Sequence, residues 1–334
     1  MRKFIKIILV FLIPIILIGG GIGSLYIIGF LTYAVIEESY TFYYNPIIIN
    51  EPEKLIISVP GKINIKCNTT TVPYYIKADV YTKAEGIYLR YWDYNYIDTQ
   101  WYNSSSDSIR LYVYYSLPTL GPGYHPTHTV KYDDAIINIT LRTDILYDLQ
   151  LFGKEVDISG NLSINKLSFE GKLKSKEANI SKIEVQEFGA GSLTLELINC
   201  NINEHIHIQT TSANINLISN NTLCSKNVEW VLASQDGSID IKIYQSEDLG
   251  ANVSGAFSTT FGNINIEYAD SLSQVGALFS TTGSGSSFLT TILGGFERIG
   301  LNIFHSTDYN TALNIFTFAL TTITGILEVE GLSG

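Results

Sequence analysis

The fold of this chain is decided by four similar stretches, Ser192-Leu193-Thr194-Leu195, Asn214-Ile215-Asn216-Leu217, Ser238-Ile239-Asp240-Ile241 and Asn263-Ile264-Asn265-Ile266. Their first apolar residues lie 22, 24 and 25 positions apart. A strand that returns at this interval is typical of a β-solenoid, in which each coil repeats the strand of the coil before it. The pattern predicts an architecture and supplies no catalytic chemistry.

The alternation within each stretch predicts which side chains face the core. Residues two apart share one face of a strand, so we expect Leu193, Ile215, Ile239 and Ile264 to stack inward. Two rows are expected to point outward: Thr194, Asn216, Asp240 and Asn265 in the first, and Glu196, Ile218, Lys242 and Glu267 in the second. The parallel β-solenoid repeat domain is expected to span residues 147–334, with the stretch 325–329 ending the stack.

Three stretches carry a resemblance to a known family: STTFGNINI at 258–266, STTG at 280–283 and TTITGILEV at 321–329. Their Ser/Thr-rich turn, followed by glycine and an alternating strand, resembles the "putative adhesin" family of prokaryotic surface β-solenoid repeat domains, over about residues 150–334. The resemblance implies a parallel solenoid with a surface role, in a bacterial or archaeal host. It implies no catalytic residue.

Residues 1–36 are expected to form a cytoplasmic tip and a transmembrane signal anchor. Residues 7–36 carry no charged side chain, and as a helix they would extend about 45 Å, more than the hydrocarbon core of about 30 Å. Basic residues precede this segment and two glutamates follow it, so the positive-inside rule predicts a single-pass protein of the cell membrane with its C-terminal domain extracellular, after a juxtamembrane stalk at 37–53. A cleaved signal peptide is the alternative.

Residues 54–146 are expected to form an aromatic-rich antiparallel β subdomain. Thirteen tyrosines lie between residues 74 and 132, together with Trp92 and Trp101. Aromatic side chains favour strands and cross-strand pairs, and they most often pack in the core of a sheet. Exposed Tyr and Trp also stack on sugars and anchor protein interfaces, so Trp92 and Trp101 are candidate recognition residues.

The charge balance is acidic outside the expected anchor. Three of the 21 basic residues precede the apolar segment and all 32 acidic residues follow it, which leaves the exterior part with a net charge of −14. This balance argues against nucleic acid and anionic membrane surfaces as partners. Seven Asn-x-Ser/Thr sequons are candidate N-glycosylation sites: Asn68, Asn103, Asn138, Asn161, Asn179, Asn220 and Asn252.

Cys200 and Cys224 are a candidate disulfide, because 24 residues separate them and matching positions in adjacent coils would lie within bonding range. Free buried thiols are the alternative, and Cys67 is left without an assigned partner. His205 and His207 share a strand face near Glu204, but their spacing is not that of a zinc site. We therefore expect no metal site and no cofactor.

These features predict a non-catalytic, membrane-anchored surface glycoprotein that acts in adhesion or as a structural component of the envelope. A glycan-binding or protein-binding module that uses the Tyr/Trp-rich segment 74–132 is the first alternative. A β-helix enzyme that degrades polysaccharides is a weaker one, because the outward rows do not concentrate carboxylates. Self-association remains open, since the ends of a solenoid expose unpaired strands unless they are capped.

Overall fold

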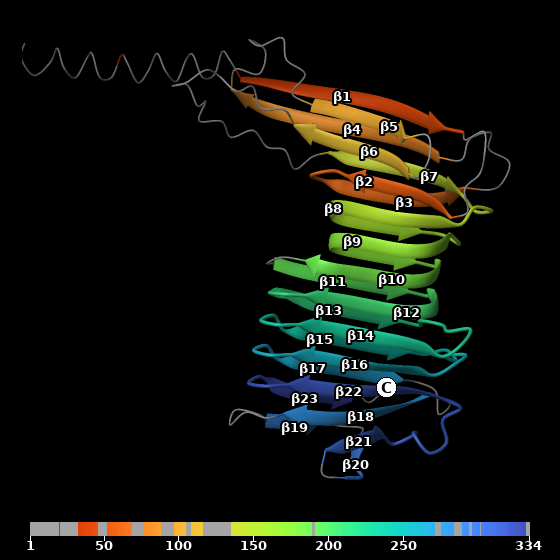
Figure 1. Ribbon diagram of the computed structural model, residues 1–334, viewed down its shortest axis with the longest axis vertical. Coiled ribbons are helices and arrows are strands. Elements are labelled where there is room, and N and C mark those ends of the chain that lie inside the picture. Colours follow the sequence, from red (N-terminus) through yellow and green to blue (C-terminus); the bar gives the residue numbers. More distant parts are fainter. Residues whose placement is uncertain are drawn as a thin grey trace, which may run out of the picture.

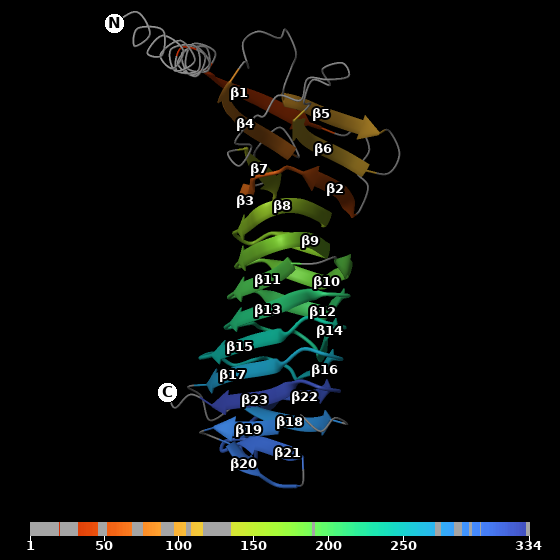
Figure 2. The same ribbon diagram turned by 90° about the vertical axis from the view of Figure 1, so that its left-hand side faces the viewer.

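The computed structural model describes residues 20, 33–45, 52–68, 76–87, 97–104, 108–115, 135–188, 191–270, 275–283, 289–293, 296–300 and 302–331. All of its labelled elements are β-strands (Figure 1), which confirms the expected all-β class. Most of them form two stacks of parallel strands, and the chain alternates between the stacks (Figure 2).

The first stack, called stack A, contains in spatial order β6 (Ser108–Tyr115), β2 (Glu53–Ser58), the first halves of β8 (Tyr147–Ser159) and β9 (Ser163–Lys176), β10 (Asn179–Phe188), β12 (Asn201–Thr210), β14 (Val228–Ser234), β16 (Val253–Thr259), β22 (Asn314–Thr322) and β18 (Val275–Gly283).

The second, stack B, contains β7 (Ile136–Arg142), β3 (Lys62–Asn68), the second halves of β8 and β9, β11 (Gly191–Ile198), β13 (Ala213–Asn220), β15 (Ile239–Gln245), β17 (Ile264–Asp270), β23 (Ile326–Gly331) and β19 (Leu289–Leu293). Antiparallel strands lie at both ends. β1 (Tyr33–Tyr44) pairs with β4 (Ile76–Ile87), which pairs with β7, and β5 (Ile97–Ser104) pairs with β6. At the other end, β21 (Ile303–Ser306) pairs with β18 and with β20 (Phe296–Arg298).

The predicted strand register is confirmed. Leu193 pairs with Ile215, Ile215 with Ile239, and Ile239 with Ile264, all in parallel and all fully buried. Both outward rows also lie in the expected register. Burying each Leu or Ile contributes about 1.5–3 kcal/mol, and because neighbouring coils complete each other's core, this stabilisation belongs to the stack rather than to any one coil.

A ladder of buried hydroxyl groups explains the Ser/Thr-x-x-Gly pattern at the turns from stack A to stack B. Thr259 Oγ1 donates to the carbonyl oxygen of Gly237 at 2.9 Å and accepts the N–H of Gly262 at 3.0 Å. Ser234 and Thr322 make the same two kinds of bond in the adjacent layers. Glycine is required because a Cβ on Gly262 would lie 2.1 Å from the carbonyl oxygen of Gly237. We call Ser234, Thr259 and Thr322 the hydroxyl ladder.

The turns that return from stack B to stack A use a different device. Glu177, Asn199 and Asn221 adopt left-handed backbone conformations, with φ angles of 63°, 50° and 52°. Each donates its N–H to a carbonyl at the end of the next coil's stack B strand. Asn tolerates this conformation because its short side chain can bond locally, whereas Glu adopts it at a cost.

The last coil of the chain does not end the stack, contrary to expectation. β22 lies between β16 and β18, and β23 lies between β17 and β19 (Figures 1 and 2). The chain leaves one layer open after β17, forms β18 to β21, and then returns to fill that layer. The filling is aromatic. The ring of Phe318, which is fully buried, lies 4.5 Å from Phe257, 5.8 Å from Trp230 and 6.0 Å from Phe279 between centroids.

The sequence predicted an antiparallel subdomain at 54–146 and a separate solenoid at 147–334. This division is wrong for β2 and β3, which pair in parallel with strands on both sides of residue 147. β2 and β3 pair in parallel with β8, and they also pair in parallel with β6 and β7. β2 and β3, which form the first coil in chain order, therefore lie between β8 on one side and the later strands β6 and β7 on the other. The antiparallel part is the excursion made by β4 and β5 before the chain returns. The physical reason is that β2 and β3 carry the same alternating apolar residues as the repeats, so they complete the same core.

Only part of the N-terminal segment, for which an anchor and a stalk were predicted, lies within the described residues. Residues 33–44, divided in the sequence analysis between the anchor and the stalk, form β1. This strand pairs with β4 over its whole length, and Lys83 Nζ lies 3.7 Å from Glu37 Oε1. Residues 1–19 and 21–32 lie outside the described residues. Within the described part of the chain, no helix has the length and apolar character needed to cross a membrane.

Candidate ligand groove

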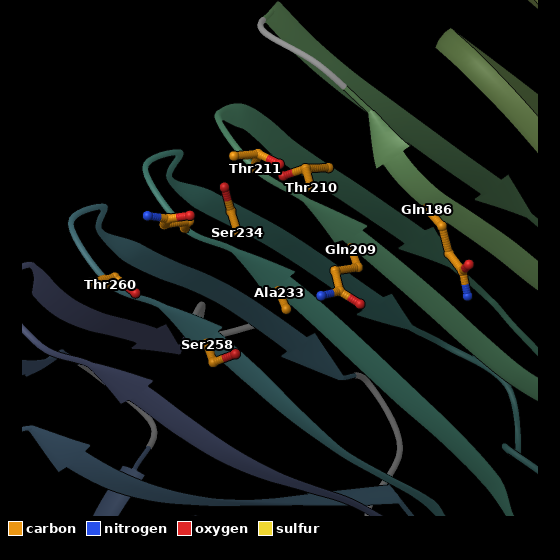
Figure 3. A pocket seen from close by; sticks show the side chains of 9 residues that line it. Gln186, Gln209, Thr210, Thr211, Ala233, Ser234, Ser258 and Thr260 are labelled. Atoms are coloured by element: carbon orange, nitrogen blue, oxygen red, sulfur yellow. The ribbon is translucent and has the colours of Figure 1, made fainter.

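A polar groove of about 410 Å³ lies on the outer face of stack A, where its strands approach the hydroxyl ladder. It crosses four successive strands, β10, β12, β14 and β16 (Figure 3). None of its lining residues is ionisable; they are Gln186, Gln209, Thr210, Thr211, Ala233, Ser234, Gln235, Ser258 and Thr260. The groove therefore offers amide and hydroxyl groups without a charge.

The strand register positions the floor of the groove. Gln209 pairs with Ala233, and Ala233 pairs with Ser258, so one outward column supplies a residue from each of three layers. Gln186 follows Val185, the partner of Ile208, and it brings a second amide to the same side (Figure 3). Successive layers repeat at about 4.8 Å, which spaces these side chains evenly along the stack.

The polar side chains that line the groove differ in whether the protein already uses their hydrogen bonds. Thr210 and Ser234 are buried and donate to the carbonyl oxygen of Ala213, so their hydroxyl groups serve the turn. The side-chain amides of Gln186 and Gln209 are exposed and form no hydrogen bond to any part of the chain that the structure describes. They are available to a ligand, each as both donor and acceptor.

Charge is concentrated elsewhere on the surface. On stack B, Lys174 Nζ lies 2.8 Å from Glu196 and Lys242 Nζ lies 2.6 Å from Glu267, so ion pairs link successive coils. The hydrogen bond from Lys242 holds the pKa of Glu267 below its ordinary value. In stack A, Lys166 acts in the same way on the pKa of Glu184. These partly exposed pairs contribute little energy individually.

The histidines noted in the sequence do come together. The rings of His205 and His207 stack with centroids 4.1 Å apart on the outer face of β12. His205 Nε2 lies 3.1 Å from Glu184 Oε1, and His207 Nε2 lies 3.4 Å from Glu229 Oε2. Across the described residues, no three His, Cys, Asp or Glu side chains are grouped as metal ligands would be.

The predicted disulfide is corrected by the register. Asn201 bridges to Leu223, so Cys200 stands one residue before the first partner and Cys224 one residue after the second. Both thiols are free and buried, and Cys200 donates to the carbonyl oxygen of Ser175 at 3.3 Å. Burial raises the pKa of Cys224 to about 12. One coil is 22 residues long at this point, from Asn201 to Leu223, whereas 24 residues separate Cys200 from Cys224.

The remaining candidate residues are placed only in part. Trp92 lies outside the described residues, and Trp101 lies in β5, whose side chains are not described. Four sequon asparagines are exposed, namely Asn138, Asn161, Asn220 and Asn252, while Asn68 and Asn179 are half-buried. Asn103 also lies in β5, whose side chains are not described. Exposure is what a glycosylated asparagine requires.

The groove itself was missed by the sequence analysis. A signal exists, because the outward positions of the second half of stack A change from charged residues to Ala, Ser and Thr. These positions are aligned by the pairing of β14, β16 and β22. In these strands apolar and polar residues do not alternate as strictly as in the stack B strands, so the sequence alone does not show which residues face outward.

Comparison with known proteins gives structural likenesses only. No family model and no curated protein matches the chain. A "putative cell adhesion protein" from Clostridium sporogenes is 12% identical, with 90% of this chain and 100% of that one covered and a TM-score of 0.26. A "putative adhesin" from Bacteroides fragilis is 14% identical, with coverages of 90% and 97% and a TM-score of 0.38.

A third solved structure, a "putative adhesin" from Parabacteroides merdae, is 10% identical, with coverages of 89% and 96% and a TM-score of 0.36. All three are bacterial proteins described in terms of adhesion. Because every TM-score is below 0.5, the function proposed below is argued from the residues of this chain.

Proposed function

We propose that this chain is a non-catalytic, single-pass surface protein whose β-solenoid ectodomain projects from the cell and acts in adhesion or as a structural component of the envelope. The observation that carries the proposal is the position of β1. This strand begins at Tyr33, within the last residues of the uncharged segment 7–36, and lies at one end of the stack (Figures 1 and 2). A membrane tether at that position leaves the other end free.

The dimensions of the stack suit a projecting rod. Twelve strands succeed one another from β1 through stack B to β19. At about 4.8 Å per strand they extend roughly 50 Å. The shared core and the ion pairs between coils favour a stiff spacer, and the acidic exterior favours solubility away from anionic lipid.

Protease treatment of intact cells tests the topology. In cells producing the full chain with a C-terminal tag, an impermeant protease should remove the tag, while a cytoplasmic marker stays intact until the cells are permeabilised. Protection of the tag in intact cells would overturn the proposal.

Deletion of the gene tests the role. We expect loss of adhesion or of envelope integrity, restored by the wild-type chain. Leu195→Asp, which places a carboxylate in the core of the stack, should fail to restore it, whereas the outward change Thr194→Ser should succeed. A deletion strain with unchanged adhesion and an unchanged envelope would refute the role.

The alternative recognition segment 74–132 has its own test. If Trp92 or Trp101 anchors a glycan or a protein, replacing either with alanine should abolish partner capture by cells without lowering the surface amount of the protein. Full capture by both variants would exclude that segment.

A further inference from the structure

We propose that the groove on stack A binds a neutral linear carbohydrate chain, which runs along the axis of the stack. The inference deepens the surface role proposed above and depends on it for its biological setting. It is carried by the chemistry of the groove, by the column that continues the groove, and by the contrast with the charged outward row of stack B.

The chemistry of the lining matches a polyhydroxylated ligand. Each sugar hydroxyl donates and accepts, and the side-chain amides of Gln186 and Gln209 do the same. Both are exposed and have no hydrogen-bond partner in the described residues. Gln235 and Thr211 stand at the turn end of the groove, and Ser258 supplies a half-buried hydroxyl on its floor. A charged ligand would find no countercharge among the lining residues.

Beyond the groove, the outward column continues along the stack through Thr321 and Thr282, and we call this continuation the track. Ser258 pairs with Thr321, and Thr321 pairs with Thr282, so the column that begins at Gln209 ends in hydroxyl groups at the far layers. The neighbouring outward column begins at Glu184 and His207 and continues through Val231, and from β16 onward it consists of Ala256, Ala319 and Ser280. Small side chains in both columns leave room for a chain that extends beyond the groove. The repeat of about 4.8 Å is close to the length of one hexose unit, so each successive sugar would meet the side chains of one layer.

The column from Gln209 to Thr282 differs in charge from the outward row Glu196, Ile218, Lys242 and Glu267 of stack B. The outward rows of stack B are crossed by lysine and glutamate pairs, and the first layers of stack A carry Lys166 and Glu184. In the column from Gln209 to Thr282, amide, methyl and hydroxyl groups follow one another and no side chain is charged. Such a mixture suits the polar edges and apolar ring faces of a neutral sugar.

Calorimetry with neutral oligosaccharides tests the inference. The full chain is purified in a detergent that is not a glycoside, and cello-, manno- and chito-oligosaccharides of two to six units are titrated into it. We expect at least one series to bind, with affinity that rises with chain length and is unaffected by salt. Absence of binding in all three series at millimolar concentration, or binding that weakens steeply with salt, would overturn the proposal.

Variants locate the site. The double change Gln186→Ala with Gln209→Ala should lower affinity at least tenfold, and Ser258→Lys should abolish binding by filling the floor of the groove. Thr194→Ala, on the outer face of stack B, is the matched control and should bind as the wild type does. Circular dichroism verifies that each variant retains its strands. Unchanged affinity in both groove variants would refute the assignment.

Analytical ultracentrifugation, which measures the oligomeric state, tests whether a second copy of the chain covers this face instead. If the protein dimerises through this track, Ser258→Lys will dissociate the dimer and no oligosaccharide will bind, which overturns the carbohydrate proposal. A protein that is displayed on cells but binds no sugar refutes the groove alone, whereas a protein that never reaches the surface refutes the proposed function.

Discussion

Replacing Thr259 with valine should destabilise the stack through two hydrogen bonds, with almost no change in shape. The Thr259 side chain is 4% exposed, and its hydroxyl joins the carbonyl of Gly237 to the N–H of Gly262. Valine fills the same volume but leaves both backbone groups buried and unpaired. Each such group costs about 1–3 kcal/mol, so we expect the free energy of unfolding to fall by about 2–6 kcal/mol.

Two assays measure this effect. Denaturant unfolding gives the loss for the cooperative unit that contains β16 and β17. Hydrogen exchange reports on the Gly262 amide itself, whose protection should fall about 30-fold or more, since each 1.4 kcal/mol corresponds to about tenfold.

Two control variants isolate the hydroxyl group. Thr259→Ser keeps both hydrogen bonds and loses one methyl group, so it should cost only about 1 kcal/mol. Thr321→Val lies on the outer face of β22 and should change stability by less than about 0.5 kcal/mol. The reasoning fails if Thr259→Val matches the wild type, or if the serine variant is as unstable as the valine variant.

Four further outcomes follow from the same structure. Glu177→Asn should stabilise the protein by about 0.5–1 kcal/mol in thermal unfolding, because asparagine tolerates the left-handed φ of 63°; destabilisation would contradict this. Phe318→Ala should cost about 3–5 kcal/mol in denaturant unfolding, since the ring is fully buried in the inserted coil, and a loss below 1 kcal/mol would argue against that insertion. The pKa of Glu267 is lowered by Lys242, so its contribution to stability is complete above its ordinary pKa of 4.5 and is lost as the pH falls through the lower folded value; Lys242→Met should flatten that part of the pH profile of melting temperature. Cys224, with its pKa raised to about 12 by burial, should resist a maleimide at pH 8 until the protein is unfolded, and rapid labelling of the native protein would refute its burial.

The coil repeat could be predicted because it depends on local alternation. Leu193 and Ile215 identify one face of a strand by their neighbours alone, and the spacing of the repeats then fixes which residues become partners. The outward rows followed from the same periodicity of two. Spacing along the chain does not predict partners that are more than one coil apart. β22 lies beside β16 although 63 residues separate Asn252 from Ile315, whose N–H bonds to the Asn252 side chain.

The candidate site depends on strands that follow the coil spacing but lack the repeat motif. Gln209, Ala233 and Ser258 lie in three strands whose sequences show no common motif, and only their pairing makes them one column. The cysteines illustrate the same difficulty, since two residues of register separate a disulfide from two free thiols.

The sequence by itself determined an all-β chain with a repeating apolar face, because strand periodicity and coil length are properties of short segments. Only the tertiary structure decided the spatial order of the coils at both ends, the hydroxyl ladder and the uncharged groove. The reason is that a strand edge and an open apolar layer accept any segment that satisfies their hydrogen bonds and fills their volume, whatever its distance along the chain.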